Sequence, residues 1–236
     1  LNYRRQGVGQ EAILEAITLR APIRVAGSAN SPNLILVTHG TNANAYGWAD
    51  DIASSMGLHA NQMGQQWQAM VLDWEPFNGG STDEFAVIGA RIPLLDIAFE
   101  FDPWLSANNG INIGESLVRW FEQTDVSFST AHLLGHSSGS WLVDAIVDDL
   151  EGKGLVGPTQ LTLFDAFTPT VGGHLASQLI SNIRKQGFSP LTTASLGDTA
   201  DFAEHYLHRG LIWTDETLPQ AIKYDLVYPL APGSIV

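Results

Sequence analysis

The sequence predicts an α/β fold, a doubly wound and mostly parallel β-sheet with helices on both faces. Short apolar runs alternate with longer segments of helical apolar spacing along most of the 236 residues, and this order is typical of parallel sheets. Two of the runs, residues 34–37 and 69–72, are unbroken, as in strands that are buried on both faces. Hydrophobic residues make up 44% of the chain and charged residues 15%, which excludes wholesale disorder. Because no linker or repeat interrupts the pattern, we expect one domain over residues 1–236.

Residues 1–30 fit two alternatives. Residues 11–19 have the pattern of a short helix, whereas residues 17–25 alternate between apolar and polar side chains, as edge strands do. Pro22 favours an edge strand, because proline has no N–H to donate to a neighbouring strand. The sequence leaves both alternatives open.

Four apolar runs are predicted to be adjacent central strands of the sheet. They are residues 34–37, 69–72, 131–134 and 161–164. Two further strands are predicted at residues 202–207 and 222–228. In such sheets ligands bind at the carboxyl ends of the strands, so the residues that follow each run are the first candidates for a site.

Three segments carry a single apolar stripe at helical spacing. They are residues 113–121, 138–150 and 175–185, and glycines follow the last two. The long connection at residues 78–110 is rich in large apolar side chains and has two interpretations. It is either a helix packed on the sheet with an irregular excursion, or a lid or insertion that forms an acyl-binding wall over the site.

The strongest functional signal is Gly135–Gly139, which reads Gly-His-Ser-Ser-Gly. A Gly-x-Ser-x-Gly string alone is weak, but this one lies between an apolar strand and an amphipathic helix, where a nucleophile elbow must be. The glycines fit a strained turn in which a Cβ would collide with the adjoining strand or helix. Ser137 is therefore the candidate nucleophile; the alternative is an ordinary glycine-bearing turn.

Two more signals follow predicted strands. His39-Gly40 leaves backbone N–H groups free beside the elbow, so the amides of Thr41 and Ser138 are the expected oxyanion hole. His39 itself is interpreted as structural. Asp165 follows the strand at residues 161–164, where a carboxylate can orient a catalytic imidazole. The alternative role for Asp165 is a turn or helix cap.

These residues resemble the α/β-hydrolase superfamily, in particular its lipase-like branch typified by pancreatic lipases. The segments that carry the resemblance are Leu72-Asp73-Trp74, Asn112-Ile113-Gly114, Gly135–Gly139 and residues 163–169. The resemblance spans residues 33–228, and its specific parts are the elbow and the aspartate strand. It implies Ser137 as the nucleophile, Asp165 as the acid, and the amides of Thr41 and Ser138 as the oxyanion hole.

The position of a catalytic histidine is where this sequence departs from the family pattern. The resemblance places the catalytic histidine after the last strand, but none of the chain's seven histidines follows residue 208. His205 and His208 are the remaining candidates within the chain, and they would point to opposite faces of a strand. The alternatives are a histidine beyond Val236, in a C-terminal segment that this chain lacks, or its loss. Without a base we expect only about 10³–10⁴-fold residual catalysis.

Composition excludes several function classes. A formal charge of −14 gives no electrostatic basis for binding nucleic acid or an anionic membrane, and no apolar run is long enough for a membrane span. The chain has no Cys, and no zinc spacing, phosphate loop or dinucleotide fingerprint occurs, so we expect neither a metal nor a cofactor. The acidic, Lys-poor balance favours an extracellular or periplasmic bacterial protein. Leu1 and the loop-like last residues suggest a piece of a longer polypeptide.

Two functions remain in competition. The first is a serine ester hydrolase of lipase or esterase type, acting on a small acyl ester or lipid. The second is a hydrolase-fold structural or interaction domain of a larger bacterial surface assembly, with little or no activity. The elbow, the His-Gly turn and Asp165 favour the first, whereas the acidity and the missing histidine favour the second.

Overall fold

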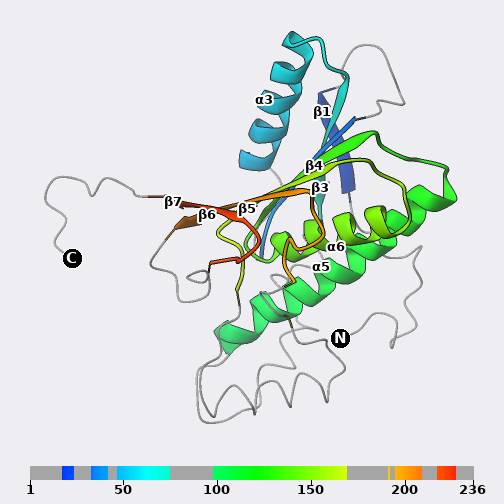
Figure 1. Ribbon diagram of the computed structural model, residues 1–236. Coiled ribbons are helices and arrows are strands. Elements are labelled where there is room, and N and C mark those ends of the chain that lie inside the picture. The colour runs from blue at the N-terminus through cyan, green and yellow to red at the C-terminus, as the bar shows by residue number, and fades with distance from the viewer. Residues whose placement is uncertain are drawn as a thin grey trace, which may run out of the picture.

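A computed structural model describes residues 18–23, 33–41, 47–74, 98–168, 191, 195–208 and 217–226. These residues form one seven-stranded sheet with the order β1-β3-β2-β4-β5-β6-β7 (Figure 1). The strands β2 to β7 are parallel, and β1 runs antiparallel to β3 at the edge. The strand bounds are β1 Thr18–Ile23, β2 Asn33–Thr38, β3 Trp67–Asp73, β4 Thr130–His136, β5 Thr159–Phe164, β6 Phe202–His208 and β7 Ile222–Leu226.

The predicted fold class is confirmed. The four apolar runs of the sequence are the neighbouring strands β3, β2, β4 and β5. In their register, Leu36 of β2 lies between Met70 of β3 and Leu133 of β4. At the N-terminal end the edge-strand alternative holds for residues 18–23, whereas residues 1–17 lie outside the described part of the chain.

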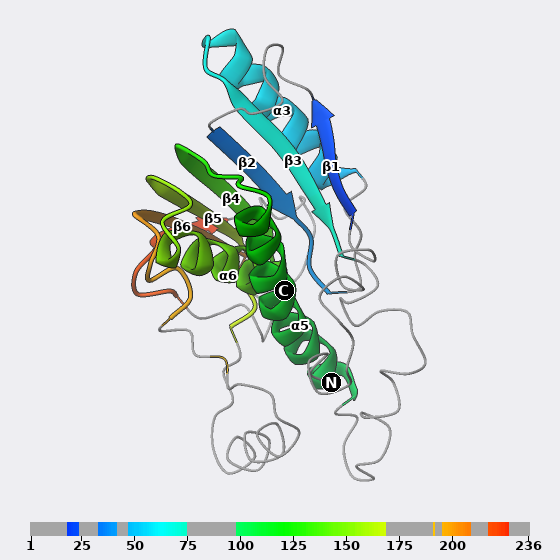
Figure 2. The same cartoon turned by 90° about the vertical axis from the view of Figure 1, so that its right-hand side faces the viewer.

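Helices cover both faces of the sheet (Figures 1 and 2). The helix α3 (Trp48–Gln62) packs on one face, and α5 (Ala98–Gln123) and α6 (Gly139–Gly152) pack together on the other. The sheet is therefore doubly wound. Since β2, β4 and β5 are adjacent, the loops that follow their carboxyl ends meet at one edge.

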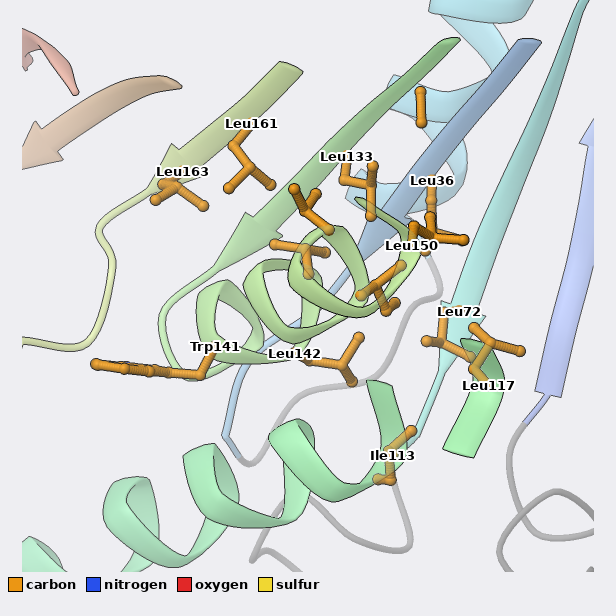
Figure 3. Close-up of a cluster of buried hydrophobic side chains, with 14 of the residues drawn as sticks. Leu36, Leu72, Ile113, Leu117, Leu133, Trp141, Leu142, Leu150, Leu161 and Leu163 are labelled. Atoms are coloured by element: carbon orange, nitrogen blue, oxygen red, sulfur yellow. The ribbon is translucent and has the colours of Figure 1, made fainter. Parts of the chain in front are cut away.

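The core divides according to the alternation of side chains along the strands. Leu34 and Leu36 of β2 point towards α5 and α6, where they join the large cluster drawn in Figure 3. Ile35 and Val37 of the same strand point towards α3. Both faces of β2 are buried, which explains its unbroken apolar run. Burying one such side chain stabilises the fold by about 1.5–3 kcal/mol.

The helices differ from the prediction in two places. The helix α3 is absent from the prediction because its buried positions are small residues, Ala49, Ala53, Gly57 and Ala60, and not large apolar ones. The helix α5 begins at Ala98, about four turns before the predicted start at residue 113. The last part of the 78–110 connection is thus helical, while residues 78–97 and the predicted helix at 175–185 lie outside the described residues.

Among the described helices, none is both long enough and apolar enough to cross a bilayer.

Candidate active site

Ser137 lies on a tight turn between β4 and α6. Its φ angle is 52°, a left-handed conformation that costs a non-glycine residue about 1–3 kcal/mol. The flanking glycines make the turn possible. A Cβ on Gly135 would lie 2.7 Å from the carbonyl oxygen of Gly139, and a Cβ on Gly139 would lie 2.2 Å from the carbonyl oxygen of His39. The string Gly-x-Ser-x-Gly therefore has the geometry of a nucleophile elbow.

The backbone of Ser137 is held by the segment that follows β5. Its N–H donates to the carbonyl oxygen of Phe164 at 2.9 Å, and its carbonyl oxygen accepts the N–H of Phe167 at 3.1 Å. These two hydrogen bonds hold the turn in its strained conformation. Ser137 is partly exposed, and its hydroxyl makes no hydrogen bond to another described residue.

Asp165 lies at the same edge of the sheet as Ser137, because Phe164 and Phe167 on either side of it are bonded to Ser137. It too has a positive φ, 43°, and its own N–H donates to the carbonyl oxygen of Tyr206 at 2.8 Å. Its carboxylate accepts the backbone N–H of His208 at the end of β6. The predicted nucleophile and the predicted acid are thus brought together from adjacent strands.

The loop after β2 packs directly against the elbow. A Cβ on Gly40 would lie 2.7 Å from the Cβ of Ser137 and 2.8 Å from the carbonyl oxygen of His136, so only glycine allows this approach. His39 fixes the loop from behind. Its Nε2 lies 3.0 Å from Oδ1 of Asp73, and its carbonyl oxygen accepts the indole N–H of Trp74 at 3.0 Å. His39 is fully buried and structural.

The amides of Thr41 and Ser138 border the Gly40–Ser137 contact. Neither amide donates a hydrogen bond to another described residue. Ser138 precedes the first residue of α6, so the positive end of the helix dipole also lies here. This arrangement can stabilise a negatively charged oxygen bound next to Ser137.

Two histidine rings near Asp165, those of His205 and His136, have lowered pKa values. Nε2 of His205 accepts the backbone N–H of Ala166 at 3.3 Å, which assigns the proton of the neutral ring to Nδ1. Burial lowers the pKa of His205; Asp165 acts in the opposite direction and Lys223 adds to the lowering. Burial likewise lowers the pKa of His136, against the charge of Asp165 and together with that of His39.

No described histidine forms a recorded hydrogen bond to the hydroxyl of Ser137. His205 is fully buried, and His208, three residues later, has an accessible side chain, as the predicted opposite faces require. The ring of His136 packs edge-on against Trp48, with centroids 5.7 Å apart. Among the described residues, therefore, no histidine is hydrogen-bonded to Ser137 as a base would be.

Sequence reasoning missed Ser106, whose hydroxyl lies 2.8 Å from that of Ser138. Ser106 belongs to the first half of α5, in the 78–110 connection, for which the sequence left a helix and a lid as alternatives. A serine in an unassigned segment carries no signal of its own. Among the described residues no group of three or more His, Asp or Glu side chains is placed to hold a metal ion.

Comparisons with known proteins give only distant similarities. No family model matches the sequence, and no curated protein matches it either. Among solved structures the chain is similar to a mature lipase of Bacillus licheniformis, at 14% identity over 82% of this chain and 71% of that one, with a TM-score of 0.37. It is similar to a thioesterase of the prodiginine pathway of Streptomyces coelicolor, at 12% identity over 79% and 75%, with a TM-score of 0.36.

A histone deacetylase from Saccharomyces cerevisiae has the same TM-score as the lipase, 0.37, at 7% identity over 92% of this chain and 88% of that chain. Similarities this distant assign no activity to the chain.

Proposed function

We propose that this protein is a serine ester hydrolase of lipase or esterase type. The observation that carries the proposal is the strained Ser137, held between Gly40 of the β2 loop and the segment after β5. Backbone strain at an accessible hydroxyl is expected where a nucleophile must be presented to substrate. The substrate we propose is a small acyl ester or lipid, and no resident metal or cofactor is needed for this chemistry.

In the proposed reaction the hydroxyl oxygen of Ser137 attacks the ester carbonyl while its proton passes to a base. The carbonyl oxygen becomes an oxyanion, which accepts hydrogen bonds from the amides of Thr41 and Ser138. Collapse of this intermediate breaks the bond to the alcohol, which leaves with the proton, and the acyl group stays on Ser137. Water then releases the acid by the same steps.

The base has three proposed sources. One is His205, whose Nε2 is already bonded to the amide of Ala166 and must exchange that bond to act. A second is His208, whose backbone contacts Asp165. The third is a histidine beyond Val236, consistent with the lipase-like pattern. In each case Asp165 stabilises the imidazolium.

The test is hydrolysis of short and medium acyl p-nitrophenyl esters by the natural full-length polypeptide and its Ser137→Ala variant. We expect the variant to lose about 10⁴-fold or more in kcat, because serine and histidine act as a unit. Ser129→Ala is the matched control, since Ser129 is an exposed residue just before β4, at the opposite end of the strand that leads to Ser137. Equal rates for the parent and the Ser137 variant would contradict the proposal.

The competing candidate is a hydrolase-fold interaction domain without turnover. It differs from the first candidate in having no base at Ser137, and among the described residues no histidine is hydrogen-bonded to that hydroxyl. If the full-length polypeptide shows no Ser137-dependent hydrolysis with any acyl length, this second candidate replaces the first.

A further inference from the structure

Three hydroxyl groups from three different elements meet behind the elbow. The hydroxyl of Ser138 lies 2.9 Å from that of Thr41 and 2.8 Å from that of Ser106. Thr41 follows the glycine that contacts Ser137, and Ser106 comes from α5. Ser106 and Ser138 are fully buried, whereas Thr41 is partly accessible. The chain of hydroxyls thus runs from the buried Ser106 to Thr41, in the loop whose Gly40 lies against Ser137.

The role of the Ser138 side chain is unusual for its position. Ser138 is the N-cap residue of α6, yet its hydroxyl makes no capping bond to the helix. Serine at this position ordinarily accepts an N–H of the first helical turn, which stabilises a helix by about 1 kcal/mol. Here the hydroxyl contacts Thr41 and Ser106 instead. The Ser138 hydroxyl thus joins two other parts of the structure and does not cap its own helix.

The number of hydroxyl protons determines which hydroxyl donates to which in the series Ser106, Ser138 and Thr41. Each hydroxyl has one proton to donate. Among the described residues Ser106 has the hydroxyl of Ser138 as its hydrogen-bond partner, and leaving a buried donor unpaired costs about 1–3 kcal/mol. Ser106 therefore donates to Ser138. Ser138, already an acceptor from Ser106, donates to Thr41.

With these donor roles, the Thr41 hydroxyl accepts a hydrogen bond from Ser138, and its own proton has no acceptor among the three hydroxyls. We propose that the Thr41 hydroxyl is a third hydrogen-bond donor to the oxyanion, beside the two backbone amides, and that Ser138 and Ser106 are positioning residues that keep it in the donor orientation. The inference rests on the proposed function and adds a side chain to its site. The ligand it binds is the negatively charged oxygen of a tetrahedral acyl intermediate.

The location of Thr41 fits this role. Gly40 and Ser137 are in contact, and the two hydroxyl residues Thr41 and Ser138 are their immediate successors in the chain. A fixed donor in a partly dry site needs no reorganisation as the oxyanion forms, so its effect belongs to the transition state. Its loss should lower kcat and leave KM nearly unchanged.

The experiment compares Thr41→Val with the parent in steady-state ester hydrolysis. Valine keeps the backbone amide and the shape but removes the hydroxyl. We expect kcat to fall about 10–100-fold with KM changed less than about threefold. Thr41→Ser should recover most of the rate. Thr130→Val is the matched control, since the Thr130 hydroxyl donates to the carbonyl oxygen of Pro158 at the opposite edge of the sheet.

The positioning residues are tested through Ser106→Ala. This change removes the donor that sets the direction, so Thr41 can turn its proton to Ser138, and we expect kcat to fall about 3–10-fold with KM unchanged. Ser116→Ala is the control on the same helix, because its hydroxyl donates to the carbonyl oxygen of Asn112. The midpoint of thermal unfolding, measured for each variant, identifies losses that come from misfolding.

The outcomes separate this inference from the proposed function. Parent turnover that needs Ser137 but is unchanged in Thr41→Val overturns the third donor alone. A Thr41→Val variant whose KM rises while kcat is kept also overturns it, because the hydroxyl then binds ground-state substrate. Absence of Ser137-dependent turnover in the parent overturns the proposed function and this inference together.

Discussion

At the scale of single residues, the geometry of the candidate active site depends on glycines, because even a Cβ would not fit at their positions. The Cα of Gly40 brings the loop after β2 against Ser137, and an added Cβ would lie 2.7 Å from the Ser137 Cβ. Cβ atoms in real structures do not approach each other this closely. Alanine at position 40 would therefore displace either the loop after β2 or the turn at Ser137. The turn at Ser137 and the loop after β2 can approach this closely only because Gly40 carries a hydrogen atom in place of a Cβ.

The first prediction concerns this contact. Gly40→Ala should lower ester hydrolysis at least about 100-fold, because a displacement near 1 Å at a reacting centre costs that much. Gly152→Ala is the matched control: no atom lies within 4 Å of its added Cβ, at the last residue of α6. Assays of both variants, with their unfolding midpoints, check this. Full activity in Gly40→Ala would show that the loop after β2 plays no part in catalysis.

A second prediction concerns His132, which donates to or accepts from the hydroxyl of Thr162 at 2.8 Å. Burial lowers the pKa of His132 from 6.5 to about 4. Between these values the unfolded chain binds more protons than the folded one, so the free energy of unfolding should fall as the pH is lowered from about 6.5 to about 4. The loss assigned to His132 is up to about 3 kcal/mol.

Urea unfolding at several pH values measures this slope. His132→Gln keeps a polar group near Thr162 but cannot titrate, so its unfolding free energy should depend less on pH than that of the parent. His59→Gln is the control, because His59 is exposed on α3. Identical slopes in the parent and in His132→Gln would mean that His132 is not buried as a neutral ring.

At the scale of elements, α6 is joined to the loop before β6 by a buried carboxyl group. Oδ1 of Asp144 accepts the backbone N–H of Gly197 at 2.6 Å, and Asp144 is 5% exposed. Burial raises the pKa of Asp144 well above its ordinary value, and the nearby charges of Asp148 and Asp198 add to this, while the bond from Gly197 acts against it. The surroundings of Asp144 as a whole therefore favour its protonated form, although the hydrogen bond from Gly197 itself favours the carboxylate.

The third prediction follows from the sign of this change. A carboxyl whose pKa is raised by folding contributes stability at low pH and loses it as the pH rises through the folded value. Asp144→Asn keeps the acceptor for Gly197 but cannot ionise. We expect it to stabilise the protein by about 1–3 kcal/mol at pH 8 and to change little at pH 4. Unfolding curves at the two pH values measure this.

Asp149→Asn is the control for this change, since Asp149 lies on the same helix with its side chain partly exposed. A destabilised Asp144→Asn at pH 8 would contradict the prediction, because it would mean that the charged carboxylate is required for the contact with Gly197.

The elements also show which parts of the fold the sequence could predict. The strands β2 to β5 were predictable because most of their residues are buried and their central segments are short and largely apolar, without a break in β2 and β3. The helix α3 was not, because it packs through alanines and a glycine, which leave no large apolar stripe. The start of α5 at Ala98 was not defined by the sequence, since its first half lies in the 78–110 connection, for which a helix was one of two alternatives.

The same contrast applies to the site. Ser137, Asp165 and the loop at Gly40 follow three strands that the sequence placed side by side, so their proximity could be predicted from strand order alone. The hydroxyl of Ser106 could not, because its contact with Ser138 depends on how α5 packs against α6. Contacts between helices depend on crossing geometry, which spacing along the chain does not define.

At the scale of the whole molecule, the order of strands assembles the site. The loop after β2, the elbow after β4 and the aspartate after β5 come from neighbouring strands, so they meet at one edge of the sheet (Figure 2). Each component would be unremarkable alone, as a glycine turn, a helix start and an acidic residue. Their convergence on Ser137 is the basis on which we propose nucleophilic catalysis.

The most direct test of this account is the reaction of the full-length polypeptide with a fluorophosphonate, followed by intact mass and peptide mapping. The reagent phosphonylates a serine only when its hydroxyl is activated. We expect one adduct, on Ser137, absent from Ser137→Ala and formed more slowly in Asp165→Asn and Thr41→Val. No adduct on Ser137, or an equal rate of labelling at exposed serines such as Ser129, would contradict the claim that Ser137 is a catalytic nucleophile.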